Sequence, residues 1–326
     1  MRCLVTGALG FLGSHLVREL LARQHSVVIL LRPGTQLDRV QNCLSRVSIV
    51  RGNLEDTSEL LRALLLEPVD AAFHLAWSGA TAEYQNSTNQ VTYNVTRTLE
   101  LWQVLEKTGC GVFIGVGYQP EYGPHLGLLS EEMPTNPVTA YGSSKLVLFI
   151  VLRQPCLTAG MRFIWMRLFS AYGLADHERH MVPSLIQTLL RRERPSLTAG
   201  EQIWDYLDVT DAVVAICISM ECEAAGVFNL GSGTPCVLRE FIAEVRNCID
   251  PVLPVGLGEV PYPPGQVMRL EADVSSIRKA TGWIPTTSWQ EGIRKSVDWH
   301  RIHCQSSADV LVQNHLTVPS QTERNR

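Results

Sequence analysis

The sequence predicts an α/β fold, a doubly wound parallel sheet with a smaller, mixed α/β C-terminal lobe. In the first half of the chain, short apolar runs alternate with amphipathic stretches, which is typical of parallel strands joined by crossover helices. Beyond the apolar run 162–168 the loops lengthen and gain proline, as in 251–264, which indicates a second unit. We expect a sheet domain over 1–168 with strands added from about 205–232, a lobe over 169–304 that forms the second wall of a ligand cleft, and a disordered tail over 305–326.

The expected elements follow from the apolar pattern in chain order. Strands are expected at 3–5, 26–31, 47–50, 71–75, 112–116 and 162–168, and helices at 14–21, 56–66, 94–107, 141–153, 181–192 and 238–248. In the second of these helices, Asp56 and Thr57 favour an N-terminus and the leucines supply a buried face. Ligands of such sheets bind where the strands end, so functional residues are expected there.

Composition excludes several classes of partner. Hydrophobic residues make up 45% of the 326 residues, charged residues 18%, and the net charge is −4. This balance offers no basic field, so we expect neither nucleic acid nor a membrane as partner. The nine cysteines show no Cys/His ligand spacing, which predicts reduced thiols and no metal. No leader pattern and no apolar run of about 18 residues is present, which predicts a cytoplasmic protein.

Gly7, Gly10 and Gly13 stand between the first expected strand and the helix that follows it. A helix N-terminus presents unpaired N–H groups and a partial positive charge, and glycines let a phosphate approach them closely. The pattern therefore indicates a binding turn for the pyrophosphate of a dinucleotide. The alternative is a glycine-rich turn that serves only tight packing.

Tyr141 and Lys145 are four residues apart in an expected helix, so their side chains share a face and can converge on one ligand. A nearby cation would lower the pKa of the tyrosine and make it a usable acid or base near neutrality. Spacing alone leaves open a surface tyrosine beside an unrelated lysine.

Several other segments occur in the order found in one known family. They are His74-Leu75-Ala76, Asn94, Tyr122-Gly123, 167–173, 205–212, 228–233 and 272–285. With the glycine turn and the Tyr-x-x-x-Lys pair, the chain from Cys3 to about Trp299 resembles the extended short-chain dehydrogenases/reductases, in their nucleotide-sugar epimerase/dehydratase branch. The resemblance implies a Rossmann-type sheet domain and NAD(P)-dependent chemistry on a nucleotide-sugar substrate.

The same resemblance implies roles for individual residues. Tyr141 would exchange a proton with a sugar oxygen, while Lys145 bonds the nicotinamide ribose and tunes the tyrosine. The residues expected to bind the cofactor are Gly7, Gly10, Phe11, Leu12, Gly13, Arg32, Asn53, Leu54, Leu75, Ala76, Tyr141, Lys145 and Leu168. Those expected to bind the substrate are Tyr118, Ser170, Val182 and Trp204.

Arg32 ends the second expected strand, where an NAD-binding chain would place a carboxylate for the ribose 2′-hydroxyl. An arginine there can pair with a 2′-phosphate, which favours NADP, with NAD as the alternative. The other interpretation is that Arg32 stacks on the adenine or points to solvent.

Three features depart from the family pattern. Tyr118 stands where relatives have a Ser or Thr that bonds the reacting oxygen, so its hydroxyl either replaces that donor in catalysis or forms a pocket wall. The next residues, Gln119 and Pro120, replace the Asp-Glu pair of the 4,6-dehydratases, which disfavours dehydration. Trp204 stands where many relatives have an Arg for the nucleotide diphosphate, and it cannot neutralise a phosphate.

These features leave hydride transfer without elimination. The favoured function is an NADPH-dependent 4-ketoreductase of a nucleotide-linked deoxyhexose. The alternatives are a nucleotide-sugar epimerase with tightly bound NAD, or a scaffold that binds a dinucleotide without turnover. Helices 91–107 and 141–153 are apolar enough to build a homodimer through a four-helix bundle, although a buried intramolecular face would look the same.

Overall fold

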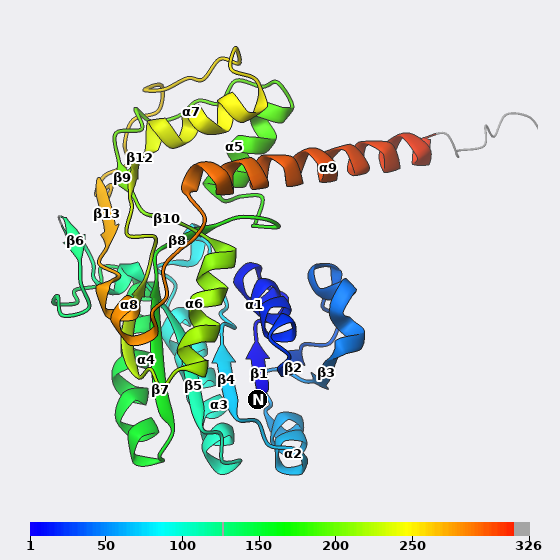
Figure 1. Cartoon of the computed structure of the whole chain (residues 1–326), viewed down its shortest axis with the longest axis vertical. Helices are drawn as coiled ribbons and strands as arrows, with labels where there is room; N and C mark the ends of the chain where they lie inside the picture. The colour runs from blue at the N-terminus through cyan, green and yellow to red at the C-terminus, as the bar shows by residue number, and fades with distance from the viewer. Residues whose placement is uncertain (126, 316–326) are drawn as a thin grey trace, which may run out of the picture.

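The computed structural model describes residues 1–125 and 127–315, and its centre is a seven-stranded parallel sheet with the order β11-β7-β5-β4-β1-β2-β3 (Figure 1). Strand order runs outward in both directions from β1 and β4, so the point where it reverses lies between these strands. The strands are β1 (Arg2–Thr6), β2 (Ser26–Leu31), β3 (Val47–Arg51), β4 (Ala71–His74), β5 (Val112–Tyr118), β7 (Arg162–Leu168) and β11 (Gly226–Leu230).

Helices cover both faces of this sheet because each strand alternates side chains between two cores. One core joins the sheet to α1, α6 and α8, and the other joins it to α2, α3 and α4. The helices are α1 (Phe11–Ala22), α2 (Ser58–Leu66), α3 (Thr96–Lys107), α4 (Ala140–Thr158), α6 (Val209–Glu221) and α8 (Ser275–Thr281). Helical segments of other types are η1 (Asp38–Arg46), η2 (Ala82–Tyr84), η4 (Gln119–Glu121) and the π-helix η3 (Gln90–Val95).

A second unit lies beyond the carboxyl ends of the strands, at the top of Figure 1. Its helices are α5 (Met181–Leu190), α7 (Leu238–Ile249) and α9 (Trp289–His315), which share one apolar core. Two small sheets connect it to the domain below, one of β8 (Ser170–Tyr172) with β10 (Tyr206–Asp208), the other of β12 (Cys236–Val237), β9 (Ile203–Trp204), β13 (Arg269–Ala272) and β6 (Leu128–Leu129). The buried Asp205 carboxylate joins their loops, since it accepts hydrogen bonds from the backbone N–H groups of Ser232, Gly233 and Ala272.

The predicted fold class is confirmed, and the strands expected at 26–31 and 162–168 match β2 and β7 residue for residue. Helix α4 is longer than expected and contains Pro155. Helix α9 runs to His315, so it includes the first residues of the segment for which a disordered tail was expected. The remainder of that tail, 316–326, lies outside the described residues.

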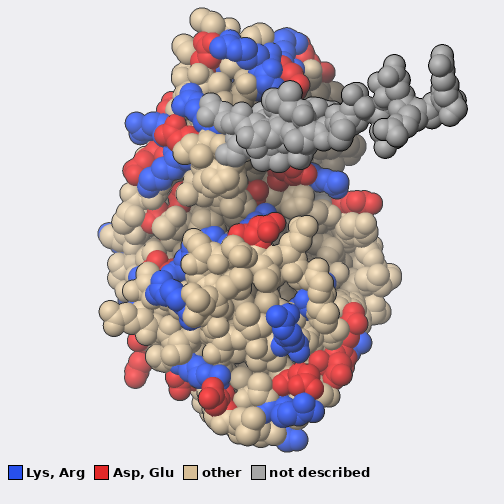
Figure 2. All heavy atoms as spheres, turned by 90° about the vertical axis from the view of Figure 1, so that its right-hand side faces the viewer, with Lys and Arg blue, Asp and Glu red and all other residues tan. Residues whose placement is uncertain are grey.

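On the face drawn in Figure 2, acidic and basic side chains are interspersed over both units, in keeping with the small net charge. The eight cysteines whose side chains are described are free thiols, and most of them are buried. None of the helices within the described residues is both long and apolar enough to cross a membrane.

Candidate active site

The first of two cavities lies at the carboxyl ends of β1, β2 and β4 and has a volume of about 350 Å³. The glycine turn forms its rim. Gly7 has a φ of +71°, and a Cβ on Gly13 would lie 2.1 Å from the carbonyl oxygen of Gly7. Glycine at these two positions therefore lets the turn pack closely on itself and on the backbone of Leu75 and Ala76 just before α1.

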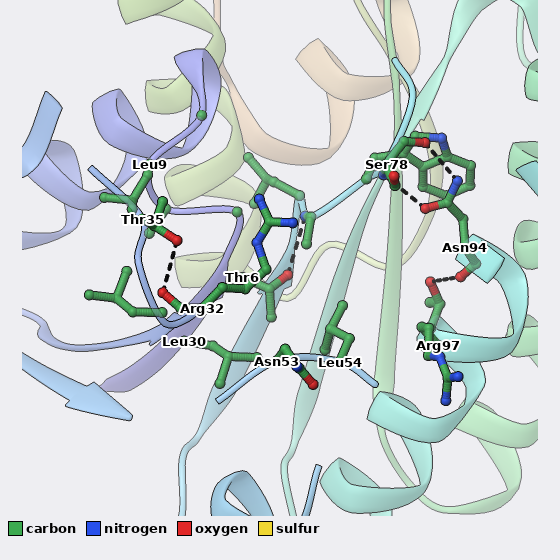
Figure 3. Close-up of a pocket in the computed structure, with 18 of the residues that line it drawn as sticks. Thr6, Leu9, Leu30, Arg32, Thr35, Asn53, Leu54, Ser78, Asn94 and Arg97 are labelled. Atoms are coloured by element: carbon green, nitrogen blue, oxygen red, sulfur yellow. Dashed lines mark hydrogen bonds between the residues drawn. The ribbon is translucent and has the colours of Figure 1, made fainter. Parts of the chain in front are cut away.

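Figure 3 shows how Arg32, Asn53 and Leu54 lie around this cavity. Arg32 follows β2 and its side chain reaches across the opening toward Thr6. The side-chain oxygen of Asn53 accepts hydrogen bonds from the backbone N–H groups of Glu55 and Asp56, which fixes the turn after β3. Two cations, Arg32 and Arg97, thus line this cavity among polar and apolar side chains.

Asn94 and His74 fix the chain that follows β4. The Asn94 amide accepts from the N–H of Ser78 at 2.8 Å and donates to its carbonyl at 2.9 Å. Burial lowers the pKa of His74 to about 3, so the ring is neutral, and it bridges the hydroxyls of Thr6 and Thr98 at 2.9 Å each. These bonds hold β1, β4 and α3 in register around the cavity.

A second cavity of about 610 Å³ continues from the first and extends under the upper unit. Gly7, Gly10, Leu75 and Trp77 line both. Each residue expected to bind the cofactor lines one of the two cavities. Together they offer a continuous space with a phosphate-binding turn at its middle, the shape that a dinucleotide requires.

Tyr141 and Lys145 meet in the second cavity because both project from the first turns of α4. That helix begins where the Thr139 hydroxyl accepts from the N–H of Gly142. The Lys145 ammonium donates to the carbonyl of Val116 at 2.8 Å and lies 3.6 Å from the centre of the Trp77 ring. Burial lowers the pKa of Lys145 to about 7, and the nearby Glu121 partly opposes this.

The expected lowering of the Tyr141 pKa is wrong in this structure. Burial raises it, and the neighbouring Tyr118 and Glu121 raise it further. The lysine does not compensate, because its ammonium lies 5.9 Å from the centre of the Tyr141 ring and is directed at Val116 and Trp77. Tyr141 is therefore a neutral phenol here.

Tyr118 ends β5 and lines the same cavity, with its ring edge-to-face against Tyr141 at 5.8 Å. Its backbone N–H donates to the Glu121 carboxylate at 2.8 Å. Glu121 is fully buried and pairs with the buried Arg167 at 3.0 Å. Burial raises the pKa of Glu121, and Arg167 opposes this rise, while Glu121 and Tyr122 raise the pKa of Arg167 against the effect of its own burial.

The upper unit contributes Arg179 and His180 to the second cavity. His180 precedes α5, and its Nδ1 lies 2.8 Å from the buried carboxylate of Asp176. That hydrogen bond raises the pKa of His180, although burial opposes it. Among the described residues no group of three or more His, Cys, Asp or Glu side chains is arranged to hold a metal ion.

Three residues for which substrate binding was expected contact other parts of the chain in this structure. The Trp204 indole N–H donates to the Ser170 hydroxyl at 2.6 Å, and Val182 is buried in the core of the upper unit. None of the three is among the described residues that line the second cavity. Ser170 and Trp204 satisfy each other's polar groups, and the helical period of α5 turns Val182 inward.

A glycine turn at the strand-order reversal, a cavity on each side of it and a Tyr/Lys pair define a dinucleotide-dependent enzyme of the short-chain dehydrogenase/reductase type. The chain belongs to the NAD dependent epimerase/dehydratase family, whose model matches residues 3–231. Its resemblance to the nucleotide-sugar branch is thereby confirmed.

Similar proteins carry several activities. The chain is 24% identical to UDP-glucose 4-epimerase of Lactobacillus helveticus over 95% of this chain and 100% of that one. It is 26% identical to dTDP-6-deoxy-L-talose 4-dehydrogenase (NAD(+)) of Aggregatibacter actinomycetemcomitans, over 77% and 93%. A solved UDP-glucuronic acid 4-epimerase of Bacillus cereus, in complex with UDP-glucuronic acid and NAD, shares its fold with a TM-score of 0.82, 23% identity and coverage of 93% and 100%.

Trp77, Glu121 and His180 are site residues that sequence reasoning missed. An aromatic residue two positions after the expected strand 71–75 was a usable signal for Trp77. The pairing of Glu121 with Arg167 gave no such signal, because it joins η4 to β7, which are far apart in the sequence.

Proposed function

We propose that the protein is an NAD-dependent nucleotide-sugar 4-epimerase. The observation that carries the proposal is the placement of Tyr141 and Lys145 in a cavity that continues into the dinucleotide space. The sequence favours a ketoreductase, whereas epimerases predominate among the similar proteins, and no similarity speaks specifically for a ketoreductase. We therefore adopt the epimerase hypothesis.

In this proposal each residue has a defined task. Bound nicotinamide supplies reversible hydride transfer at the sugar C4. Tyr141 moves the proton of the C4 oxygen, and Tyr118, whose ring contacts it, donates a hydrogen bond to the same oxygen. Lys145 holds a positive charge near this oxygen at and below neutral pH. Arg179 and His180 face the opposite end of the sugar nucleotide, where its diphosphate carries negative charge.

The test is interconversion of C4 epimers. Purified protein is incubated with UDP-, dTDP-, CDP- and GDP-hexoses, and products are resolved by anion-exchange chromatography. We expect one epimer pair to equilibrate without net change in nicotinamide absorbance. Tyr141→Phe should lower this rate by about 10²–10⁴-fold, since it removes a general acid–base group. Equal rates in the wild type and the variant would overturn the assignment.

A second candidate, the NADPH-dependent ketoreductase, is favoured by one observation, the Arg32 guanidinium in the first cavity. A 2′-phosphate would give this cation a charged partner. Under the epimerase proposal, Arg32→Gln should change NAD affinity by less than about threefold, a small effect of losing one exposed charge. If the wild type instead binds NADP more tightly, consumes NADPH with a keto sugar and loses that activity in the variant, the ketoreductase replaces the epimerase.

A further inference from the structure

Trp77 occupies the junction between the two cavities. It stands shortly after the carboxyl end of β4 and lines both of them. Its side chain therefore borders both the cavity beside Arg32 and the cavity that holds Tyr141 and Lys145.

The indole contacts both members of the Tyr/Lys pair. The Nζ of Lys145 lies 3.6 Å from the Trp77 ring centre, and the Tyr141 ring packs edge-to-face against the indole at 5.7 Å. An ammonium has three N–H donors. One is taken by the carbonyl of Val116 at 2.8 Å and one can point at the indole face, which leaves a third for a ligand in the cavity.

Trp77 is itself held in place by the π-helix η3. Its Nε1 donates to the side-chain oxygen of Gln90 at 2.7 Å. The amide nitrogen of Gln90 donates to the carbonyls of Gly79 at 2.6 Å and Tyr84 at 3.0 Å. Gln90 is 1% exposed, and both the oxygen and the nitrogen of its side-chain amide form hydrogen bonds. The indole therefore has a fixed orientation beside the lysine.

We propose that Trp77 is a positioning residue that holds the Lys145 ammonium over its indole face, with one N–H directed at the bound cofactor. The aromatic face suits this task, because it attracts a cation without removing its charge or its proton. A carboxylate in the same place would neutralise the charge that the site needs. The proposal deepens the proposed function, but the binding and titration of Lys145 do not depend on which sugar reacts.

Few other ionisable groups face Lys145. Tyr141 lies one turn earlier on α4, Glu121 acts on it from η4, and His74 on β4 is neutral. Of these three groups, only the Glu121 carboxylate favours the charged form of Lys145, as the indole face does. That carboxylate is already paired with Arg167. The indole face is thus the partner of the ammonium that a single substitution can remove cleanly.

The experiment exploits the small number of lysines. The chain has lysines only at 107, 145, 279 and 295, so a protein labelled with ¹³C at the lysine Cε gives few resonances. Lys145→Met identifies the Lys145 signal. Its titration midpoint, expected near 7 in the wild type, is then compared in Trp77→Phe, which keeps an aromatic face, and Trp77→Leu, which does not.

We expect Trp77→Leu to lower the Lys145 midpoint by about one pH unit, the shift that corresponds to a cation–π contact. In the same Leu variant, NAD affinity, measured by calorimetry below neutral pH, should fall by about 3- to 30-fold. Trp77→Phe should keep a Lys145 midpoint and an NAD affinity close to those of the wild type. Trp102→Phe, in α3 and away from both cavities, is the matched control and should move neither.

An unchanged midpoint in Trp77→Leu would overturn the proposal, as would equal losses in the Phe and Leu variants, which would indicate packing alone. Thermal unfolding of each variant establishes that it folds. If Trp77→Leu does not fold, Gln90→Met provides the second test, since it removes the bond that orients the indole and should move the midpoint in the same direction. Failure of the epimerase assay with a shifted midpoint would reject the proposed function and retain this inference.

Discussion

At the scale of single residues, the site depends on the ionisation of Tyr141 and Lys145. The sequence predicts where these two residues lie, but not their pKa values. The Tyr-x-x-x-Lys spacing predicted that Tyr141 and Lys145 share a helix face, and they do. It also suggested that the lysine acidifies the tyrosine, whereas burial dominates and shifts both groups toward neutrality. The spacing of the two residues predicts that they lie close together. Their desolvation depends on residues from distant strands, which the spacing does not reveal.

Lys145→Met should therefore abolish activity and stabilise the protein. Replacing a buried charge by an apolar side chain of similar volume stabilises by about 1–4 kcal/mol in favourable cases. The pKa of Lys145 is about 7 in the folded protein and near 10.5 when unfolded, so folding releases its proton between these values. Wild-type stability thus rises with pH in that window and the advantage of the variant shrinks.

Urea unfolding of wild type and Lys145→Met, at neutral pH and at higher pH, measures this difference. Lys279→Met, at an exposed site on α8, serves as control. A variant less stable than the wild type at neutral pH would contradict the prediction.

Tyr118→Phe decides between the two roles left open for Tyr118. A hydrogen bond to a charged or developing oxyanion is worth about 1.5–3 kcal/mol, so loss of the hydroxyl should slow turnover by about 10- to 100-fold. Because the ring contact with Tyr141 remains, substrate affinity should change little. Steady-state kinetics checks this, and an unchanged kcat would reduce Tyr118 to a pocket wall.

At the scale of elements, the predictable parts are those with a strong local pattern. The strands β2 and β7 and helices α5 and α7 lie within a few residues of their expected bounds, because their apolar periodicity is local. The two-residue strands β6, β9 and β12 were not predicted, since their pairing partners are far along the chain. The π-helix η3 was not predicted either, because it lies just before α3 in a segment expected to be an ordinary helix from residue 94. The Glu121–Arg167 ion pair was not predicted, because its two residues are also far apart in the sequence.

Glu121→Gln should destabilise the protein by about 3–5 kcal/mol, because it leaves the Arg167 charge buried without a counter-charge. The matched control is Glu59→Gln, which breaks an exposed i,i+3 pair with Arg62 on α2 and should cost under about 1 kcal/mol. Chemical denaturation of both variants gives the comparison. If the two variants lose similar free energies of unfolding, burial does not strengthen the Glu121–Arg167 ion pair.

At the scale of the whole molecule, the chain builds two units around one site. The sheet domain supplies the glycine turn, the Tyr/Lys pair and Trp77, and the upper unit supplies Arg179 and His180. Every residue expected at the cofactor lines one of the two cavities, and its role there stays a prediction. Ser170 and Trp204 bond to each other and Val182 packs in the core of the upper unit, so their expected role at the substrate also stays a prediction.

The expected homodimer also concerns the whole molecule. Helix α4 exposes Val147, Ile150, Val151 and Leu157, which repeat at helical spacing along one face. Ile150 is 60% exposed, and a charge there should prevent burial of this face against a second copy. We expect the wild type to be a dimer by light scattering and Ile150→Glu to be a monomer with an unchanged far-ultraviolet circular dichroism spectrum. A monomeric wild type would refute the homodimer.

The two cavities share Gly7, Gly10, Leu75 and Trp77 but differ in the rest of their walls. Every described residue around the first lies before position 100, whereas the second also draws on residues 168–180. Under the proposed function, mutations in 169–180 can alter which sugar is accepted and leave the wall of the first cavity unchanged. In evolutionary terms, substrate range can then diversify through this one later segment.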